Sequence, residues 1–299
     1  MSLLPEQAQA EVFAERPYAL APATFSPGGS ATTVDGGYQL SGKWSWASGV
    51  MHGNWAMVAG MVSDGGRPDY RLFLLPIEDV QIDDVWFMSG MKGTGSNDIV
   101  VTDRFVPAYR TVSFLSILDG TAPGALLHDA PLYRWPLVPM LALGAAAPAL
   151  GTAESTVERF RLRVTERVMA YSGGAVQRDR PAAQMQLGRS AADVIAARSI
   201  YDGAIQQLEQ ILDHGGSLDA AQRSRYRLIA AHVVFLARKV VSELCAASGG
   251  SAHRLDSPFQ RAMRDVNTMA GHVVFDYDAT TELYGRVQVG LDVPTGTLV

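Results

Sequence analysis

Apolar and polar residues alternate in short runs over the first 125 residues of the chain. Residues 32–34 and 38–44 form two such runs on either side of Asp35-Gly36-Gly37. An Asp-Gly pair between two alternating runs is a strong hairpin signal. Further apolar runs follow at residues 55–62, 70–75 and 98–101. Short strands at this spacing predict a small antiparallel barrel or sandwich.

After residue 130 the apolar residues recur every three or four positions, which is the period of an amphipathic helix. Two stripes carry this period: Leu187, Ala191, Val194, Tyr201, Ile205, Leu208 and Leu212, and then Tyr226, Ile229, Val233, Leu236, Val240 and Leu244. We expect a further long helix over about residues 138–169. Ser257-Pro258 is typical of an N-cap followed by a first-turn proline.

These patterns predict an α+β protein with two parts. An antiparallel β-barrel or sandwich domain is expected over residues 14–125. An antiparallel four-helix bundle is expected over residues 126–299, because long amphipathic helices bury their apolar stripes most simply against one another.

Composition and charge narrow the class of protein. Of the 299 residues, 47% are hydrophobic and 18% are charged, so the chain can bury a core and is not expected to be disordered. Its net charge is -5, whereas dedicated nucleic-acid binders usually carry a basic excess. The single cysteine, Cys245, excludes a disulfide framework and fits a reducing compartment. Since there is no signal peptide and no apolar run of the roughly 18 residues that a membrane helix needs, we expect a cytoplasmic protein without nucleic-acid or membrane partners.

Common catalytic and binding motifs are absent from the sequence. It holds no Gly-x-Ser-x-Gly elbow, no His-Glu-x-x-His pair and no phosphate loop ending in Gly-Lys-Ser/Thr. The glycine-rich segment 91–96 precedes an expected strand, so it lacks the helix N-terminus on which phosphate binding relies. None of the six histidines has another at i+4, and we expect no metal site.

Residues 41–55 are the densest candidate segment, because Trp44, Trp46 and Trp55 lie within it. Two interpretations stay open. Tryptophan is a bulky core residue, so the three side chains can simply be buried. Alternatively, a flat aromatic ligand lies against the strand, with hydroxyl and backbone donors at its polar edge. Ser48 is then one of these donors, although a serine at a strand end can equally have no special role.

This segment resembles the flavin-contacting strand of the acyl-CoA dehydrogenase superfamily, whose dehydrogenases read Asn-Gly-Gln-Lys-x-Trp-Ile-Thr-Asn and then reach an Asn-Trp pair. On that pattern Trp46 takes the place of the tryptophan that stacks on the flavin. Ser48 takes the place of the threonine or serine that hydrogen-bonds the central flavin ring, and Asn54-Trp55 that of the closing pair. The Trp-Ala-Ser-Gly version, followed by His and Trp, is closer to the flavin-dependent monooxygenase branch.

The resemblance implies an enzyme that takes reduced FMN or FAD from a separate reductase and oxygenates a small substrate, either aromatic or amine. Residues 91–107 resemble the strand that closes the family's middle domain. Thr165-Glu166-Arg167 resembles its Glu-Arg pair, which implies that Arg167 reaches a flavin phosphate, often across a subunit contact. The simpler interpretation of Arg167 is an exposed arginine at the end of a helix.

The C-terminal segment distinguishes the branches. Met263-Arg264-Asp265 matches the Met-Arg-Asp that precedes the dehydrogenases' Tyr-Glu-Gly-Thr. Their proton-abstracting glutamate then falls on Val273, which has no proton-accepting atom, so a dehydrogenase is disfavoured. His272 stands where the monooxygenase branch tends to carry an active-site histidine, and an imidazole with a pKa near 6.5 can accept or share a proton at neutral pH. Without the resemblance, His272 is a polar core or surface residue.

The resemblance covers about residues 4–290. It implies that residues 1–13 are the remnant of an N-terminal helical domain that the chain lacks, and that the protein is a homodimer or homotetramer. Residues 21–30 are a degraded form of the dehydrogenases' Thr-Glu-Pro-Gly-x-Gly-Ser-Asp, which also weighs against an acyl-CoA substrate. A flavin monooxygenase is therefore favoured. The alternatives are an acyl-CoA dehydrogenase-like oxidoreductase and a non-catalytic flavin-binding or structural remnant.

Overall fold

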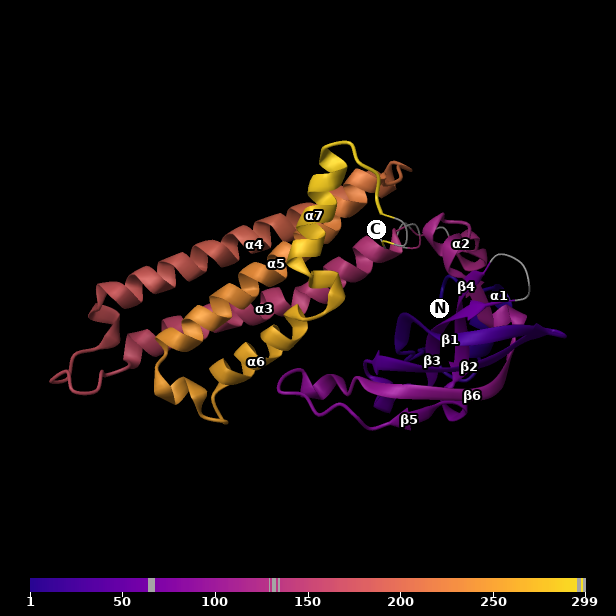
Figure 1. Cartoon of the computed structure of the whole chain (residues 1–299). Coiled ribbons are helices and arrows are strands. Elements are labelled where there is room, and N and C mark those ends of the chain that lie inside the picture. The colour runs from indigo at the N-terminus through magenta and orange to yellow at the C-terminus, as the bar shows by residue number, and fades with distance from the viewer. Residues whose placement is uncertain (64–67, 129, 131–132, 134, 295–296, 298–299) are drawn as a thin grey trace. The chain divides into compact units, whose positions relative to one another are not determined.

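The structure is a computed structural model and describes residues 1–63, 68–128, 130, 133, 135–294 and 297. The chain divides into two units, which are described separately (Figure 1). The sheet unit comprises Met1–Met88 and Lys92–Pro136, and the helical unit comprises Ser89–Met91 and Leu137–Val299. Strands and long helices are thus segregated along the chain, and the protein is α+β as predicted.

Within the described residues, seven strands form one mixed sheet in the order β5-β6-β2-β1-β3-β4-β7. Their bounds are β1 (Ala23–Val34), β2 (Gly37–Ala47), β3 (Trp55–Val62), β4 (Asp69–Pro76), β5 (Gln81–Asp83), β6 (Asn97–Pro107) and β7 (Thr111–Ser113). The predicted hairpin is confirmed, because β1 and β2 pair antiparallel around Asp35-Gly36, where Gly36 has a φ of 75°.

One strand pairing departs from the antiparallel arrangement that the sequence predicts, since β1 and β3 pair in parallel. The second edge of β2 is already taken by β6, with which it pairs antiparallel. After β2 the chain reverses again, so β3 runs in the direction of β1 and joins the free edge of that strand. The expectation that every pairing is antiparallel therefore does not hold.

The core of the sheet unit forms around Trp44 on β2, whose side chain is 1% exposed. Its indole Nε1–H donates to the carbonyl oxygen of Ala59 at 2.6 Å, so the polar atom of the buried ring is satisfied. Gly29 on β1 lies against this ring, and a Cβ at that position would be 2.3 Å from Cζ2 of Trp44. The apolar neighbours in this core include Leu40, Val58, Phe73, Leu75, Ile99 and Val101. The glycine of the degraded dehydrogenase motif thus has a packing role.

Two short helices, α1 (Glu6–Val12) and α2 (Phe114–Leu118), complete the sheet unit. α1 lies within the first thirteen residues and buries Ala8 and Val12. Arg110 pairs with Glu11 on α1, and this interaction lowers the pKa of the Glu11 carboxyl.

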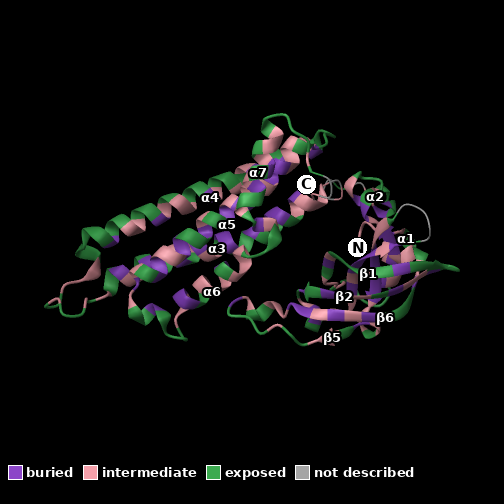
Figure 2. Ribbon diagram, in the orientation of Figure 1, coloured by how far each residue is buried: buried purple, intermediate pink, exposed green. Residues whose placement is uncertain are grey.

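α5 is the central helix of the helical unit. The helices of this unit are α3 (Leu137–Glu166), α4 (Pro181–Asp213), α5 (Ala220–Ala247), α6 (Pro258–Ala270) and α7 (Tyr277–Gln288). α5 packs against each of the other four (Figure 1). Its buried positions recur along the helix and appear purple in Figure 2. The predicted start of α6 is confirmed, because Ser257 Oγ accepts a hydrogen bond from the N–H of Phe259.

Among the helices described, α3 is long and apolar enough to cross a membrane by length and composition alone. The core helices of soluble proteins pass the same test, so this is weak support for a span. α3 packs against both α4 and α5.

Candidate active site

Trp46 stands near the end of β2, where a bulge turns its side chain away from the core. β2 pairs with β6 through Trp44↔Ile99 and then through Ala47↔Asn97, so β2 has one more residue than β6 between these pairs. Trp46 has a φ of 66° and a side chain that is 67% exposed, whereas Trp44 is buried. Regular alternation would place both rings on one face of the sheet. The extra residue instead presents a large flat ring to solvent.

Ser48 belongs to a chain of three hydroxyl groups. Its Oγ lies 2.8 Å from the Oγ of Ser96, which lies 2.8 Å from the Oγ1 of Thr94. Ser96 is 3% exposed, and the N–H of Gly49 donates to the carbonyl of Thr94 at 2.7 Å, which holds the two segments together. When Ser96 donates to Ser48, the hydroxyl hydrogen of Ser48 remains available for a ligand.

The remaining residues of the tryptophan-rich segment have structural contacts. The ring of Trp55 lies below the guanidinium of Arg110, whose Cζ is 5.4 Å from the ring centroid. Asn54 Oδ1 accepts a hydrogen bond from the N–H of Leu20 at 2.7 Å. The interpretation of the segment as a ligand-binding strand therefore fits Trp46 better than Asn54 or Trp55.

In the helical unit, Arg167 directly follows α3 and reaches the end of α5. Its Nη1 donates to the carbonyl of Ser248 at 2.7 Å, and Nη2 of Arg163 donates to the same carbonyl at 2.8 Å. Nη2 of Arg163 also donates to Ser251 Oγ at 2.6 Å. Carbonyls at a helix C-terminus carry partial negative charge, which explains how one of them holds two guanidinium groups.

Arg163 and Arg167 have hydrogen-bond donors that remain available to an anion. In the part of the chain that the structure describes, neither Arg163 nor Arg167 forms an ion pair with a carboxylate, and the buried Nε of Arg163 has no hydrogen-bond partner. Burial and the neighbouring Arg167 lower the pKa of Arg163. Gly249, with a φ of 71°, leaves the space beside the Arg167 guanidinium open, since a Cβ there would lie 3.2 Å from Nη2 of Arg167. This arrangement suits a phosphate group.

His272 precedes the short 3-10 helix η9 (Val273–Phe275) and caps it. Its Nδ1 accepts a hydrogen bond from the N–H of Val274 at 3.1 Å. Although the residue is exposed, the protein packed around its ring lowers its pKa from 6.5, because desolvation disfavours the charged form. The neutral ring then carries its hydrogen on Nε2. This geometry favours a hydrogen-bond donor at Nε2 over the proton acceptor that the sequence indicated.

The Met263-Arg264-Asp265 motif holds the segment Ser89–Met91 within the helical unit. Asp265 Oδ1 accepts from the N–H of Met91 at 2.7 Å, and Arg264 donates to the carbonyl of Ser89. Gly90 fits against α6 only because it lacks a side chain, since a Cβ would lie 2.2 Å from the carbonyl oxygen of Arg264. The motif therefore positions the backbone that leads into the glycine-rich segment.

Thr94, Ser96 and Arg163 are candidate site residues that the sequence patterns did not indicate. The first two lie in the glycine-rich segment 91–96, whose sequence argues against a phosphate loop and indicates no other binding role. Arg163 precedes Arg167 by four residues, and i, i+4 spacing on an expected helix is the signal that could have revealed it. Trp46 and Ser48 lie in the sheet unit, whereas Arg167 and His272 lie in the helical unit. Across the described residues, no group of three or more His, Cys, Asp or Glu side chains could hold a metal ion.

The chain is similar to known flavin enzymes over almost its whole length. Residues 143–277 match the family model "Acyl-CoA dehydrogenase, C-terminal domain". The chain is 37% identical over 294 residues to the "Pigment production hydroxylase" of Rhodococcus sp. (strain ATCC 21145), and the aligned region covers 98% of this chain and 75% of that protein. It is 33% identical over 300 residues to the "Flavin-dependent monooxygenase, oxygenase subunit HsaA" of Rhodococcus jostii (strain RHA1), covering 100% of this chain and 78% of that protein.

A solved structure agrees with these relatives. XiaF from Streptomyces sp., in complex with FADH2 and glycerol, superposes with a TM-score of 0.90 at 30% identity and covers 99% of this chain and 75% of that one. The chain therefore belongs to the flavin-dependent monooxygenase branch of the acyl-CoA dehydrogenase superfamily, as its sequence motifs indicated. It is an oxidoreductase of the reduced-flavin-dependent class.

Proposed function

We propose that the chain is the oxygenase component of a two-component system that oxygenates a small aromatic or amine substrate. The observation that carries the proposal is the exposed Trp46 ring beside the Ser48 hydroxyl at a bulged strand end. The sequence identity of 33% to a protein named as an oxygenase subunit supports a separate reductase as the source of reduced FMN or FAD. When bound, the reduced flavin supplies the electrons with which one atom of O2 enters the substrate and the other leaves as water.

Trp46 and Ser48 bind the flavin ring in this proposal. The exposed indole offers a flat apolar face for stacking, and its ring has no competing partner among the contacts described. In this proposal the buried hydroxyl of Ser96 donates to Ser48 Oγ, and Ser48 donates its own hydroxyl hydrogen to a polar ring atom. Both groups are uncharged, so they orient the ring without adding a fixed charge beside it.

Arg167 and Arg163 hold the flavin phosphate. Their shared anchor on the Ser248 carbonyl fixes both guanidinium groups while leaving donors for phosphate oxygens. FMN and FAD both supply such a group. The family resemblance implies that this contact can cross subunits, and we propose a homodimer or homotetramer.

His272 orients the substrate by donating from Nε2 to its hydroxyl oxygen or amine nitrogen. Because Nδ1 is occupied by the Val274 N–H, the ring keeps its remaining hydrogen on the free nitrogen. A hydrogen bond donated to a phenol oxygen favours its ionised form, which raises the electron density of the aromatic ring. His272 and Ser48 are accordingly the proposed catalytic residues.

Several finer features of the protein are also proposed. Residues 14–125 form a barrel-like domain in this proposal, and residues 126–299 are built around a four-helix bundle of α3, α4, α5 and α6, with residues 1–13 as the end of a preceding helical domain. α5, which contacts the other three helices, supports the bundle. A cytoplasmic location is supported by Cys245, a buried free thiol that suits a reducing compartment.

Acyl-CoA dehydrogenation is disfavoured by Val273, which occupies the position of the catalytic glutamate and has a side chain that is 72% exposed and purely hydrocarbon. Bleaching of bound oxidised flavin by a saturated acyl-CoA without oxygen would overturn this rejection. Absence of affinity for reduced flavin would favour a structural remnant over both enzyme classes.

The monooxygenase proposal is tested with the full chain, a flavin reductase, NADH and a panel of phenols and amines. We expect product with one added oxygen atom by mass spectrometry, and 18O2 should supply that atom. Product should disappear when the reductase or oxygen is omitted. Tight binding of reduced flavin without oxygenation of any panel member would instead favour the non-catalytic alternative.

A further inference from the structure

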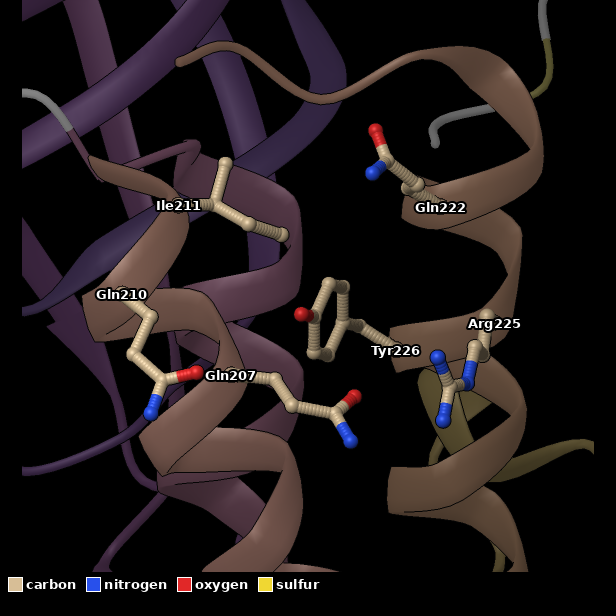
Figure 3. Close-up of a pocket in the computed structure, with 6 residues that line it drawn as sticks. All are labelled: Gln207, Gln210, Ile211, Gln222, Arg225 and Tyr226. Atoms are coloured by element: carbon tan, nitrogen blue, oxygen red, sulfur yellow. The ribbon is translucent and has the colours of Figure 1, made fainter. Parts of the chain in front are cut away.

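A small cavity opens between α4 and α5 in the helical unit (Figure 3). Its volume is about 250 Å³, and its lining residues are Gln207, Gln210, Ile211, Gln222, Arg225 and Tyr226. It lies in the first two turns of α5, whereas the arginine pair described above meets the other end of that helix. At 1.5 Å per residue, about 33 Å of helix separates Tyr226 from Ser248, so the cavity is not part of the proposed phosphate site.

Tyr226 is the first indication that this cavity receives a polar ligand. The residue is 2% exposed, yet its hydroxyl makes no hydrogen bond with any residue that the structure describes. In Figure 3 the side chain extends from α5 towards α4, with its oxygen between Ile211 and Gln207. Burial raises the pKa of Tyr226, which keeps the hydroxyl protonated and able to donate. Tyr226 lines the cavity and its oxygen is not among the fully buried polar atoms that lack a partner, so the hydroxyl is accessible to a polar ligand there.

The sign of the ligand's charge follows from the other lining groups. Arg225 is exposed at the rim, and no described carboxylate neutralises its guanidinium. The six lining residues include no aspartate or glutamate, while three carboxamides supply further N–H donors. Only part of Gln222 is engaged, since its Oε1 accepts from the N–H of Asp219. A cation would meet Arg225 unfavourably, whereas an anion would satisfy both Arg225 and Tyr226.

The volume of the cavity and the apolar part of its wall further restrict the class of ligand that fits. Ile211 and the ring of Tyr226 contribute hydrocarbon surface beside the polar groups. A free phosphate ion would leave this surface in contact with water, whereas a compact organic acid can cover it. The volume is below that of most sites for drug-sized ligands, which limits the acid to one small ring or a short branched chain.

We propose that this cavity is a binding site for a small organic carboxylate. Arg225 and Tyr226 bind the carboxylate oxygens, and the glutamine side chains supply further N–H donors. Ile211 packs against the apolar body of the ligand. The cavity shares no lining residue with those assigned to flavin and substrate, so it is a second site whose existence does not depend on the oxygenase assignment.

The proposal is tested by calorimetric titration of the full chain with benzoate, with benzamide as the neutral analogue and inorganic phosphate as the anion without an apolar body. Benzoate should bind saturably and raise the melting temperature, because a ligand that binds only the folded state stabilises it. Benzamide and phosphate should each bind at least about tenfold more weakly, since each lacks one of the two recognition elements.

Three variants localise the binding to the cavity. Arg225→Gln should weaken benzoate binding by about tenfold or more, and Tyr226→Phe by about fivefold, while neither lowers the melting temperature of the free protein appreciably. Arg225→Glu should reverse the preference, so that benzylamine binds better than benzoate. Arg189→Gln, which alters another exposed arginine on α4, should leave both affinities unchanged.

Either of two results would overturn the proposal. One is the absence of saturable benzoate binding in the millimolar range. The other is binding that Arg225→Gln and Tyr226→Phe leave unchanged, because the carboxylate would then lie elsewhere on the protein. Oxygenation assays do not enter this test, so its outcome is separable from that of the monooxygenase proposal.

Discussion

The proposed site residues of the sheet unit are neutral, whereas those of the helical unit are charged or titratable. Trp46, Ser48 and Ser96 offer an aromatic face and hydroxyl groups, while Arg163 and Arg167 converge on one carbonyl. A flavin has the same division, because its ring is flat and weakly polar and its tail carries phosphate. If the proposed function is correct, the sheet unit binds the flavin ring and the helical unit binds the flavin phosphate, and this division predicts different responses to mutation, salt and pH.

The largest expected effect concerns His272, the titratable member of the helical unit. His272→Ala should lower product formation by about 100- to 10,000-fold, the usual contribution of a positioned acid–base or donor group, while reduced flavin and oxygen yield hydrogen peroxide instead. His272→Gln keeps a side-chain donor and should retain part of the product. Product, peroxide and melting temperature are measured on the same samples, with His253→Ala as the control at an exposed histidine.

The pH profile sharpens this prediction. Because burial lowers the pKa of His272, its neutral donor form persists at pH 6.5 and should be lost only as the pH falls below that value. The same sign applies to folding, since the preference for a neutral ring stabilises the protein above pH 6.5 and disappears through the lower folded pKa. A His272→Ala protein with a lower melting temperature but unchanged product and no extra hydrogen peroxide would show that the side chain only fills space.

The two tryptophans of β2 should differ strongly in their effect on stability. Trp44→Ala removes a buried ring and its hydrogen bond to Ala59, so the free energy of unfolding should fall by about 3–5 kcal/mol. Trp46→Ala removes an exposed ring and should change it by less than about 0.5 kcal/mol. Denaturant unfolding of both variants measures the difference. Equal losses would mean that Trp46 is a packing residue and would remove the basis for the comparison.

That difference also marks the limit of what the sequence could predict. The α+β class, the hairpin at Asp35-Gly36 and the long helices follow from periodicity and turn residues, which are local signals. The parallel β1–β3 pair and the bulge that separates Trp46 from Trp44 depend on which strand edges are free after the chain has folded. No glycine marks the bulge, and Trp46 adopts a positive φ that tryptophan rarely takes.

The candidate site was predictable only in part for the same reason. Trp46, Ser48, Arg167 and His272 were found through family motifs, not through their spacing. Ser96 and Arg163 became visible only in the folded structure, which brings distant segments together. Ser48 and Ser96, for example, are 48 positions apart in the sequence. The donor role of His272 depends on a backbone N–H two residues later, which no side-chain pattern reveals.

The arginine pair should affect flavins according to their phosphate content. Arg163→Gln combined with Arg167→Gln should weaken the binding of reduced FMN and FAD by about 10- to 100-fold, because charge-assisted hydrogen bonds are lost. Reduced riboflavin, which has no phosphate, should bind both proteins equally. Raising the salt concentration should weaken FMN and FAD binding in the wild type more than in the double variant. Arg189→Gln serves as the charge-matched control, and an equal loss for riboflavin would contradict the division between the units.

The smallest expected effect concerns Ser96, which contacts the ligand only through Ser48 in this account. Ser48→Ala should weaken reduced-flavin binding by about fivefold to tenfold, and Ser96→Ala by less, in keeping with about 1 kcal/mol for a neutral hydrogen bond. The double variant should resemble Ser48→Ala alone, because the two hydroxyls act in series. Additive losses would mean that Ser96 acts independently of Ser48.

The central claim is that the exposed ring of Trp46 binds reduced flavin, and an anaerobic titration with reduced riboflavin tests it most directly because this ligand avoids the arginine pair. The wild type and Trp46→Phe should bind it with similar affinity, whereas Trp46→Ala should bind it at least about tenfold more weakly while unfolding at the same denaturant concentration. Unchanged affinity in Trp46→Ala would contradict the claim.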